Sequence, residues 1–420
     1  MSPHDKRATR VVVIVFFTVF LDLVGFGIII PLLPLYVKSM GGTAESVGFL
    51  FASFSFTQLI ATPVLGRLSD RFGRRRVILT SLAGNAMSMG LFAVATDTRL
   101  LPILFVSRIL AGATAGNISA CQAAVADVTQ GADRAKAMGR IGAAIMAGMI
   151  LGPGIGSFVS KWGPAAPPLA AAALAAVDLV AAFFLMPETR VTPETTAVFT
   201  DASDATPYRG PQASARPSHF KSSLEILRAP PIARIMLLSF LTFFSMTTLQ
   251  VALPLIVDAR FGWDSSAVGR LFVLFGLVGL VVQGLLIGKM TRRFGAWNLV
   301  TASTLASIAG LLGIAAAQTT WTLLAGLVLF GIGLSLMNPL LSTLASERAG
   351  PSRQGMVLGV AQSASGLART IGPIAIGMIY RRISPGASFV GGACAAFLAL
   401  IVATIARSRD TAPAIEVSET

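Results

Sequence analysis

The sequence predicts an all-α membrane protein with twelve transmembrane helices in two pseudo-symmetric bundles of six. Three observations lead to this prediction. The chain of 420 residues is 54% hydrophobic and only 12% charged, whereas soluble domains average about 25% charged residues. Its apolar segments are long enough to cross a bilayer, which takes about 20 residues. Its two halves also carry related sequences at corresponding positions.

Twelve apolar segments are expected to span the membrane. Those of the first half are 11–37, 46–66, 77–96, 100–126, 138–160 and 166–187. Those of the second half are 232–257, 267–288, 297–317, 321–345, 355–379 and 387–406. The first segment is too long for the apolar core of a signal peptide, so we expect it to remain as the first span.

The two halves are related by an internal repeat. Residues 66–73 read GRLSDRFG and residues 288–295 read GKMTRRFG, while Gly152-Pro153 is matched by Gly372-Pro373. Two such halves, with a binding site between them at the midplane, are an architecture of secondary transporters. The predicted domains are an N-terminal bundle at 1–187, a cytoplasmic linker at 188–229, a C-terminal bundle at 230–408 and a cytoplasmic tail at 409–420.

The net charge of +14 does not indicate a nucleic-acid partner. The basic residues stand in short clusters between apolar segments, as the positive-inside rule expects for cytoplasmic loops. We therefore expect a multi-pass protein of the cell inner (plasma) membrane, surrounded by lipid, with both termini in the cytoplasm.

No pattern in the chain indicates an enzyme, a metal site or a cofactor. Cys121 and Cys394 lie far apart inside apolar segments, and the two histidines, His4 and His219, lie outside the predicted spans. No phosphate-binding loop is present that would favour ATP-driven transport. An ion gradient is therefore the expected energy source, and the proton is the expected ion.

The strongest motif is the loop between the second and third segments, GRLSDRFGRRR at residues 66–76. It resembles the signature loop of the major facilitator superfamily, which implies the major facilitator fold. Its carboxylate is expected to accept hydrogen bonds from a facing helix N-terminus and from nearby arginines. These contacts would hold the cytoplasmic ends of the two halves together in one conformation. The residues assigned to this conformational latch are Gly66, Asp70, Arg71, Gly73 and Arg74. The second-half copy has Arg292 where Asp70 stands and is expected to be degenerate.

The fifth segment carries a second motif, formed by Gly139, Gly148, Gly152, Pro153 and Gly156. This spacing resembles the signature of the drug:proton antiporters in that superfamily, although a serine follows where the family has one more glycine. Small residues permit close helix packing in lipid, and proline favours a bend. A tightly packed helix without a transport role is the alternative.

Two of the charged residues expected within the bilayer are candidates for proton coupling. Asp22 lies near the midplane of the first segment, and Arg108 lies in the fourth. Intramembrane charges are costly, and they mark functional sites by default. Burial disfavours the charged carboxylate, whereas a nearby arginine favours it. Asp22 would therefore carry the proton and Arg108 would tune its charge. A buried structural ion pair is the alternative.

A substrate cavity between the halves is expected to have adaptable apolar walls with a few polar donors. Its candidate residues are Phe26, Ser119, Gln122, Met146, Phe244, Met246, Gln250, Asn338 and Gln362. Asp178 and Arg369 are secondary candidates that are as well explained by structural roles.

The resemblance is greatest to the twelve-span drug:proton antiporters, tetracycline exporters included. It implies alternating-access export of amphipathic molecules coupled to protons. We also expect the protein to function as a monomer. Tetracycline exporters have an acid in the third span where Ser88 stands here. A transporter of a lipid, lysolipid or metabolite, including a symporter, therefore remains an alternative, as does a membrane receptor without transport.

Overall fold

The computed structural model describes residues 3–190, 230–349 and 354–408. The described residues form helices without strands, which confirms the predicted all-α class. The expected linker at 188–229 lies outside this part except for residues 188–190, and the expected tail at 409–420 lies outside it entirely.

The described helices fall into two groups. The first comprises α1 Pro3–Ile29, α2 Leu33–Ser39, α3 Ala44–Phe72, α4 Arg74–Thr98, α5 Leu101–Thr114, α6 Asn117–Val128, α7 Gly131–Val159, the short η1 Ser160–Trp162 and α8 Ala166–Leu185. The second comprises α11 Pro230–Phe261, α12 Ser265–Val281, the π-helical η2 Val282–Leu286, α13 Ile287–Phe294, α14 Ala296–Ala315, α15 Thr320–Ala349, α16 Gln354–Arg382 and α17 Pro385–Ser408.

Eleven helical stretches of the described chain are long and apolar enough to cross a membrane. The twelfth expected span is α16, which is as long as its neighbours but more polar, and which packs between α3 and α11. The chain is therefore a multi-pass membrane protein.

Two expected spans are broken helices rather than continuous ones. The segment 11–37 divides into α1 and α2 because Pro31 cannot donate the hydrogen bond that continues a helix. The segment 100–126 divides into α5 and α6 at Ala115 and Gly116.

The internal repeat appears as the same turn in both groups. Gly73 connects α3 to α4 with a φ of 103°, and Gly295 connects α13 to α14 with a φ of 77°. Both values lie in the region that glycine alone adopts at little cost. The matching glycines of the two sequence copies therefore perform the same structural task.

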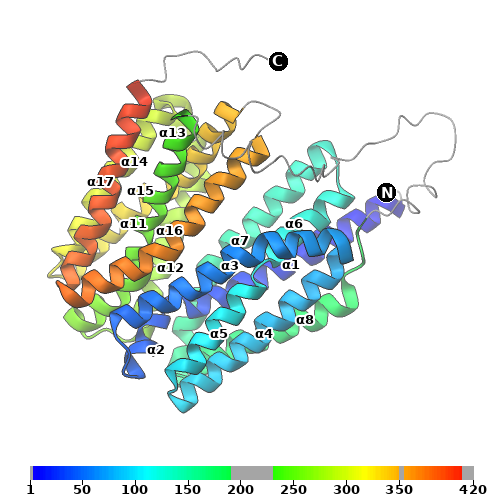
Figure 1. Ribbon diagram of the computed structural model, residues 1–420, viewed down its shortest axis with the longest axis horizontal. Helices are drawn as coiled ribbons and strands as arrows, with labels where there is room; N and C mark the ends of the chain where they lie inside the picture. The colour runs from blue at the N-terminus through cyan, green and yellow to red at the C-terminus, as the bar shows by residue number, and fades with distance from the viewer. Residues whose placement is uncertain (1–2, 191–229, 350–353, 409–420) are drawn as a thin grey trace.

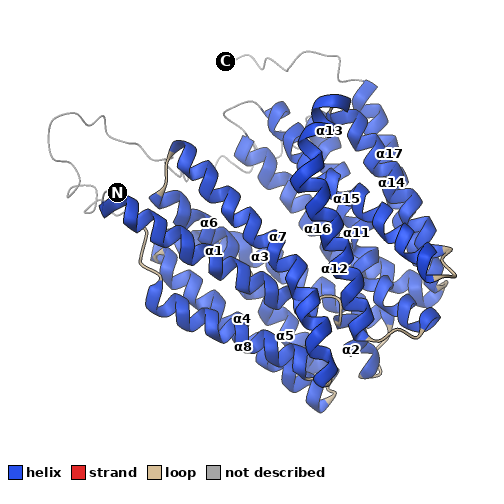
Figure 2. Ribbon diagram, turned by 180° about the vertical axis from the view of Figure 1, so that it is seen from behind, coloured by secondary structure: helices blue, strands red, loops and turns tan. Residues whose placement is uncertain are grey.

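The two groups meet at the end of the molecule that lies away from both termini, and they diverge toward the end where the termini lie (Figure 1, Figure 2). The main contacts between them are α3 with α16 and α7 with α12. One hydrophobic cluster lies across this junction, with Ile28 and Leu50 from one group and Leu253 and Ile376 from the other. We call the joined end the closed end and the other the terminal end.

Candidate functional site

Asp22 on α1 is held by two amides from neighbouring helices. Asn85 Nδ2 on α4 donates a hydrogen bond to Asp22 Oδ1 (2.6 Å), and Asn117 Nδ2 at the start of α6 donates to Asp22 Oδ2 (3.2 Å). The thiol of Cys121 donates to Asn117 Oδ1 (3.2 Å), which turns the amide nitrogen of Asn117 toward the carboxylate. Each carboxylate oxygen therefore has a neutral donor in place of water.

Asp22 also lines a small internal cavity of about 80 Å³. Its walls are formed by α1, α3, α4, α5 and α6, and they include Phe26, Phe54, Gln58 and Met89. The rings of Phe26 and Phe54 lie 5.4 Å apart between their centroids. Ligand pockets usually enclose about 300–1,000 Å³, so this cavity can hold water beside Asp22 but cannot enclose a drug-sized molecule.

Arg108 does not pair with Asp22, which differs from the expected arrangement. Its side chain on α5 is buried, its guanidinium lies 5.0 Å from the ring centroid of Phe92, and Nη2 is near Met89 Sδ (3.8 Å) and Ser107 Oγ (3.4 Å). Its Nε has no hydrogen-bond partner among the described residues. A buried cation held mainly by an aromatic face and a thioether is unusual and costly.

The other predicted cavity residues do not gather around Asp22. Gln122, Asn338 and Gln362 are exposed. The partly buried members are Ser119, Met146, Phe244, Met246 and Gln250. Met146 approaches α12 near Gly279. Of the predicted set, only Phe26 lines the Asp22 cavity.

Asp178 and Arg369, the secondary candidates, lie in different groups. Asp178 on α8 is buried, and its Oδ2 has no hydrogen-bond partner among the described residues. Arg369 on α16 places its guanidinium 5.4 Å from the ring centroid of Phe243.

The loop at residues 66–76 makes its contacts within the first group. Arg74 Nη1 donates to Asp70 Oδ1 (2.5 Å), and Arg74 Nε donates to Asp127 Oδ2 (3.0 Å) at the end of α6. The carboxylate of Glu188 accepts from the backbone N–H of Arg74 (2.9 Å), at the first turn of α4, where helix N-termini favour anions. The Asp70 side chain is 61% exposed, so the predicted latch between the halves is not engaged in this conformation.

The glycines of α7 form a contact stripe against α1. A Cβ atom at Gly148, Gly152 or Gly156 would meet the backbone of α1, including Phe20, Val24 and Ile28. Gly139 differs, because nothing lies within 4 Å of its would-be Cβ. Three of the four glycines in the motif therefore permit close helix approach.

Ser157, which replaces the last glycine of the signature, crosses to the second group. Its hydroxyl donates to the backbone oxygen of Ser266 (2.5 Å) on α12. This departure from the family pattern therefore adds a contact at the closed end.

Ion pairs join the two groups at the closed end. Lys38 near the end of α2 pairs with Asp258 near the end of α11. Glu45 Oε2 accepts from Arg381 Nη1 (2.5 Å) and its Oε1 accepts from Arg382 Nε (3.1 Å) at the end of α16. None of these five residues was singled out from the sequence, because each is an ordinary charge at a helix end until the fold brings the partners together.

Asn85 and Asn117 were also missed as partners of Asp22. Each is a single amide in an apolar stretch, which is more often a packing contact between helices than part of a site. The available signal was the presence of an intramembrane carboxylate that required donors.

A two-group helical fold with a small cavity at an intramembrane carboxylate is typical of a membrane transporter. The chain belongs to the Major Facilitator Superfamily, whose model matches residues 15–373 and 235–419.

Individual relatives cover nearly the whole chain. It is 28% identical over 386 residues to multidrug resistance protein 2 of Bacillus subtilis (strain 168), with 90% of this chain and 91% of the relative aligned. It is 31% identical over 379 residues to the class E tetracycline resistance protein of Escherichia coli, with 88% of each aligned. Among solved structures, the human organic anion transporter MFSD10 has a TM-score of 0.66 and 26% identity, covering 96% of this chain and 100% of that one.

Proposed function

We propose that this protein is a proton-coupled secondary transporter that exports amphipathic small molecules by alternating access. The observation that carries the proposal is the position of Asp22, which lies at a cavity wall between Asn85 and Asn117. The relatives named for multidrug and tetracycline resistance support the cargo class.

Asp22 can couple proton binding to helix packing. As a carboxylate it accepts both amide hydrogen bonds, and these connect α1 to α4 and to α6. When Asp22 is protonated, one of its oxygens becomes a hydrogen-bond donor and is a weaker acceptor for an amide N–H. Gain of a proton therefore loosens contacts between α1 and its neighbours. A cationic or amphipathic substrate that favours the charged carboxylate would be released at the same time.

The closed end supports alternating access. In this conformation the ion pairs of Lys38 and Glu45 join the groups there, while Asp70 at the terminal end makes no ion pair with the second group within the described ranges. The opposite conformation would break the ion pairs and engage Asp70. Each end then has its own set of polar contacts, and each set favours one conformation.

The proposed orientation places both termini in the cytoplasm of a cell whose inner (plasma) membrane holds the protein. The cluster from Arg74 to Arg76 lies at the terminal end, where the positive-inside rule expects cytoplasmic loops. The conformation described here is then open to the cytoplasm. Each chain has its own Asp22 cavity, so we propose that the monomer is functional.

A second candidate function is transport of organic anions, including a lipid or metabolite. The buried cation Arg108 and the likeness to human MFSD10, an organic anion transporter, favour it. Arg108 would then attract the anionic group of the cargo.

Transport by the purified protein in proteoliposomes tests the proposal. Ethidium serves as the cationic probe and carboxyfluorescein as the anionic one, each with a pH gradient of either sign and the membrane potential clamped. An antiporter accumulates ethidium when the lumen is acidic, and a symporter does so when the lumen is alkaline. Ethidium uptake at the same rate with either pH gradient would overturn proton coupling. Gradient-driven uptake of carboxyfluorescein alone would favour the second candidate.

A further inference from the structure

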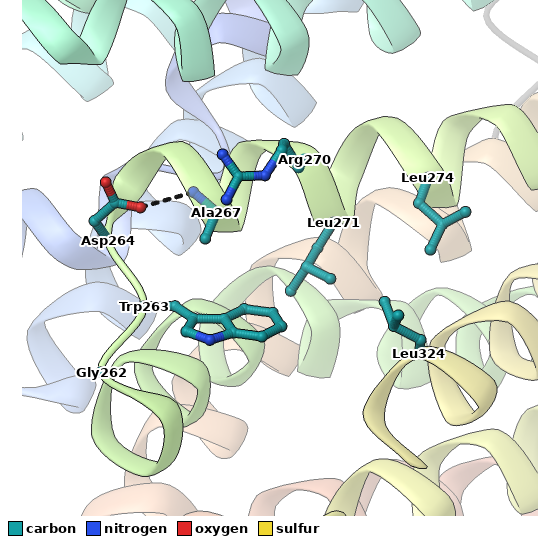
Figure 3. Close-up of a pocket in the computed structure, with 8 residues that line it drawn as sticks. All are labelled: Gly262, Trp263, Asp264, Ala267, Arg270, Leu271, Leu274 and Leu324. Carbon is teal, nitrogen blue, oxygen red and sulfur yellow. Dashed lines mark hydrogen bonds between the residues drawn. The ribbon is translucent and has the colours of Figure 1, made fainter. Parts of the chain in front are cut away.

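A groove lies between the start of α12 and the start of α15, apart from the Asp22 cavity. Its outer part, about 510 Å³, is lined by the loop after α11 and the first turns of α12 (Figure 3). The residues drawn there are Gly262, Trp263, Asp264, Ala267, Arg270, Leu271, Leu274 and Leu324. A second hollow of about 610 Å³ shares Leu274 and Leu324 and continues along α15 past Val328 to Ile332. The two hollows adjoin at these shared leucines, and we call them together the groove.

The groove faces away from the first group and toward the membrane. Gly269 and Gly276 are two of the positions where α12 contacts α7. Leu271 and Leu274 lie roughly 140–200° around the helix from Gly269, since each residue turns an α-helix by about 100°. On α15, Trp321 borders the groove and is 80% exposed. In a multi-pass membrane protein, an exposed apolar groove on this face contacts lipid.

The chemistry of the groove changes along its length. Its inner part is lined by Trp321, leucine, alanine, valine and isoleucine side chains, which suit an acyl chain. Its outer end is lined by a cation, an anion and an indole, from Arg270, Asp264 and Trp263. Indole rings are typical of the membrane interface.

Arg270 and Asp264, the two charged residues at the outer end, have different hydrogen-bond partners and do not form an ion pair with each other. Arg270 Nη1 donates to Ser266 Oγ (2.8 Å), and Asp264 Oδ1 accepts from the backbone N–H of Ala267 (2.9 Å). No ion pair involves either residue within the described ranges. Arg270 therefore has N–H groups left for a phosphate, and Asp264 has Oδ2 left for a cation.

We propose that this groove binds a zwitterionic phospholipid with a primary ammonium, that is, phosphatidylethanolamine, in the leaflet at the closed end. Arg270 holds the phosphate, Asp264 and the Trp263 ring hold the ammonium, and the α12–α15 groove holds an acyl chain. A purely anionic head group has no ammonium to pair with Asp264. It would place either a second negative charge or an uncharged glycerol beside that carboxylate. A choline head group cannot donate a hydrogen bond to that carboxylate.

Native mass spectrometry of the purified full chain with equal amounts of dioleoyl phosphatidylethanolamine, phosphatidylcholine and phosphatidylglycerol tests the proposal. A photoactivatable phosphatidylethanolamine, mapped by peptide analysis, locates the bound lipid. The wild type should retain the ethanolamine lipid in preference, with cross-links at 262–274 and 321–332. Cross-links confined to other helices would overturn the site.

Three variants separate the roles of the charges. Asp264→Asn keeps a helix-capping side chain and should lower the ethanolamine-to-glycerol retention ratio by about fivefold, the size expected for loss of one exposed ion pair. Arg270→Gln should lower the retention of all three lipids. Lys161→Gln removes a charge at the same end but outside the groove and should change nothing. An unchanged lipid preference in Asp264→Asn, or a wild type that does not prefer the ethanolamine lipid, would contradict the proposal.

Discussion

Asn85 on α4 and Asp22 on α1 are joined by a hydrogen bond of 2.6 Å between Nδ2 and Oδ1, although 63 residues separate them in the chain. This contact connects the intramembrane carboxylate to α4, the helix whose first residue, Arg74, pairs with Asp70 at the terminal end. Together with Asn117 it makes the packing of α1 depend on the charge of one side chain.

Removal of either amide should weaken proton-driven transport. Asn85→Ala or Asn117→Ala leaves one buried carboxylate oxygen without its donor, which costs about 1–3 kcal/mol. We expect the gradient-driven uptake of ethidium to fall about tenfold in each variant. Thr98→Ala is the control on the same helix as Asn85, because the Thr98 hydroxyl donates to the Val94 carbonyl away from the cavity, and it should transport normally. Equal loss in the control would contradict a specific role for the amides.

Asp70→Asn should impair transport without destabilising the conformation described here. Its carboxylate is 61% exposed and pairs with Arg74, and exposed pairs contribute about 0–1 kcal/mol. The engaged latch of the opposite conformation would lose the negative charge of its acceptor, and with it the charge-assisted hydrogen bonds. Spin labels across the terminal end should report a larger population of the open state there. A shift toward closure at that end would contradict the latch assignment.

Breaking the Lys38–Asp258 pair should open the closed end. Lys38→Asp places two carboxylates together, and the added Asp258→Lys substitution restores an opposite pair in reverse order. We expect the single variant to shift the conformational equilibrium by about fivefold and the double variant to return it toward the wild-type value. Spin-label distances across that end measure both. A double variant that remains as open as the single one would exclude direct pairing.

Alanine substitutions at the glycines of α7 should lower stability where the glycine packs against α1 and should not lower it where the glycine faces free space. At Gly152 a Cβ would lie 2.6 Å from the Val24 carbonyl oxygen and 2.7 Å from Gly27 Cα, and overpacking of this kind costs about 1–3 kcal/mol. Gly152→Ala should therefore lower the thermal stability of the purified protein. Gly139→Ala has free space and should leave it unchanged or raise it by up to about 1 kcal/mol. The reverse order in scanning fluorimetry would refute the packing account.

Local signals in the sequence were sufficient for the fold and for one central residue. The all-α membrane class follows from apolar length, and the matching turns at Gly73 and Gly295 follow from the repeat. Asp22 stands out because a carboxylate inside a span is costly wherever the helix lies.

The partners of Asp22 could not be predicted in the same way. Two intramembrane charges were expected to meet, but Arg108 turns to Phe92 instead, and amides 63 and 95 residues away hold the carboxylate. Which side chains face one another depends on helix rotation, and helix rotation is set by packing rather than by hydropathy. The Glu45 pairs depend further on the conformation, because they connect residues 336 and 337 positions apart only when this end is closed.

Proton release on substrate binding tests the role of Asp22 most directly. The purified protein in weakly buffered detergent solution is mixed with ethidium, and a pH indicator reports released protons while ethidium fluorescence reports binding. The wild type should release a proton as ethidium binds, and Asp22→Asn should bind ethidium without releasing one at any pH tested. Proton release from Asp22→Asn equal to that of the wild type would contradict the assignment of proton coupling to Asp22.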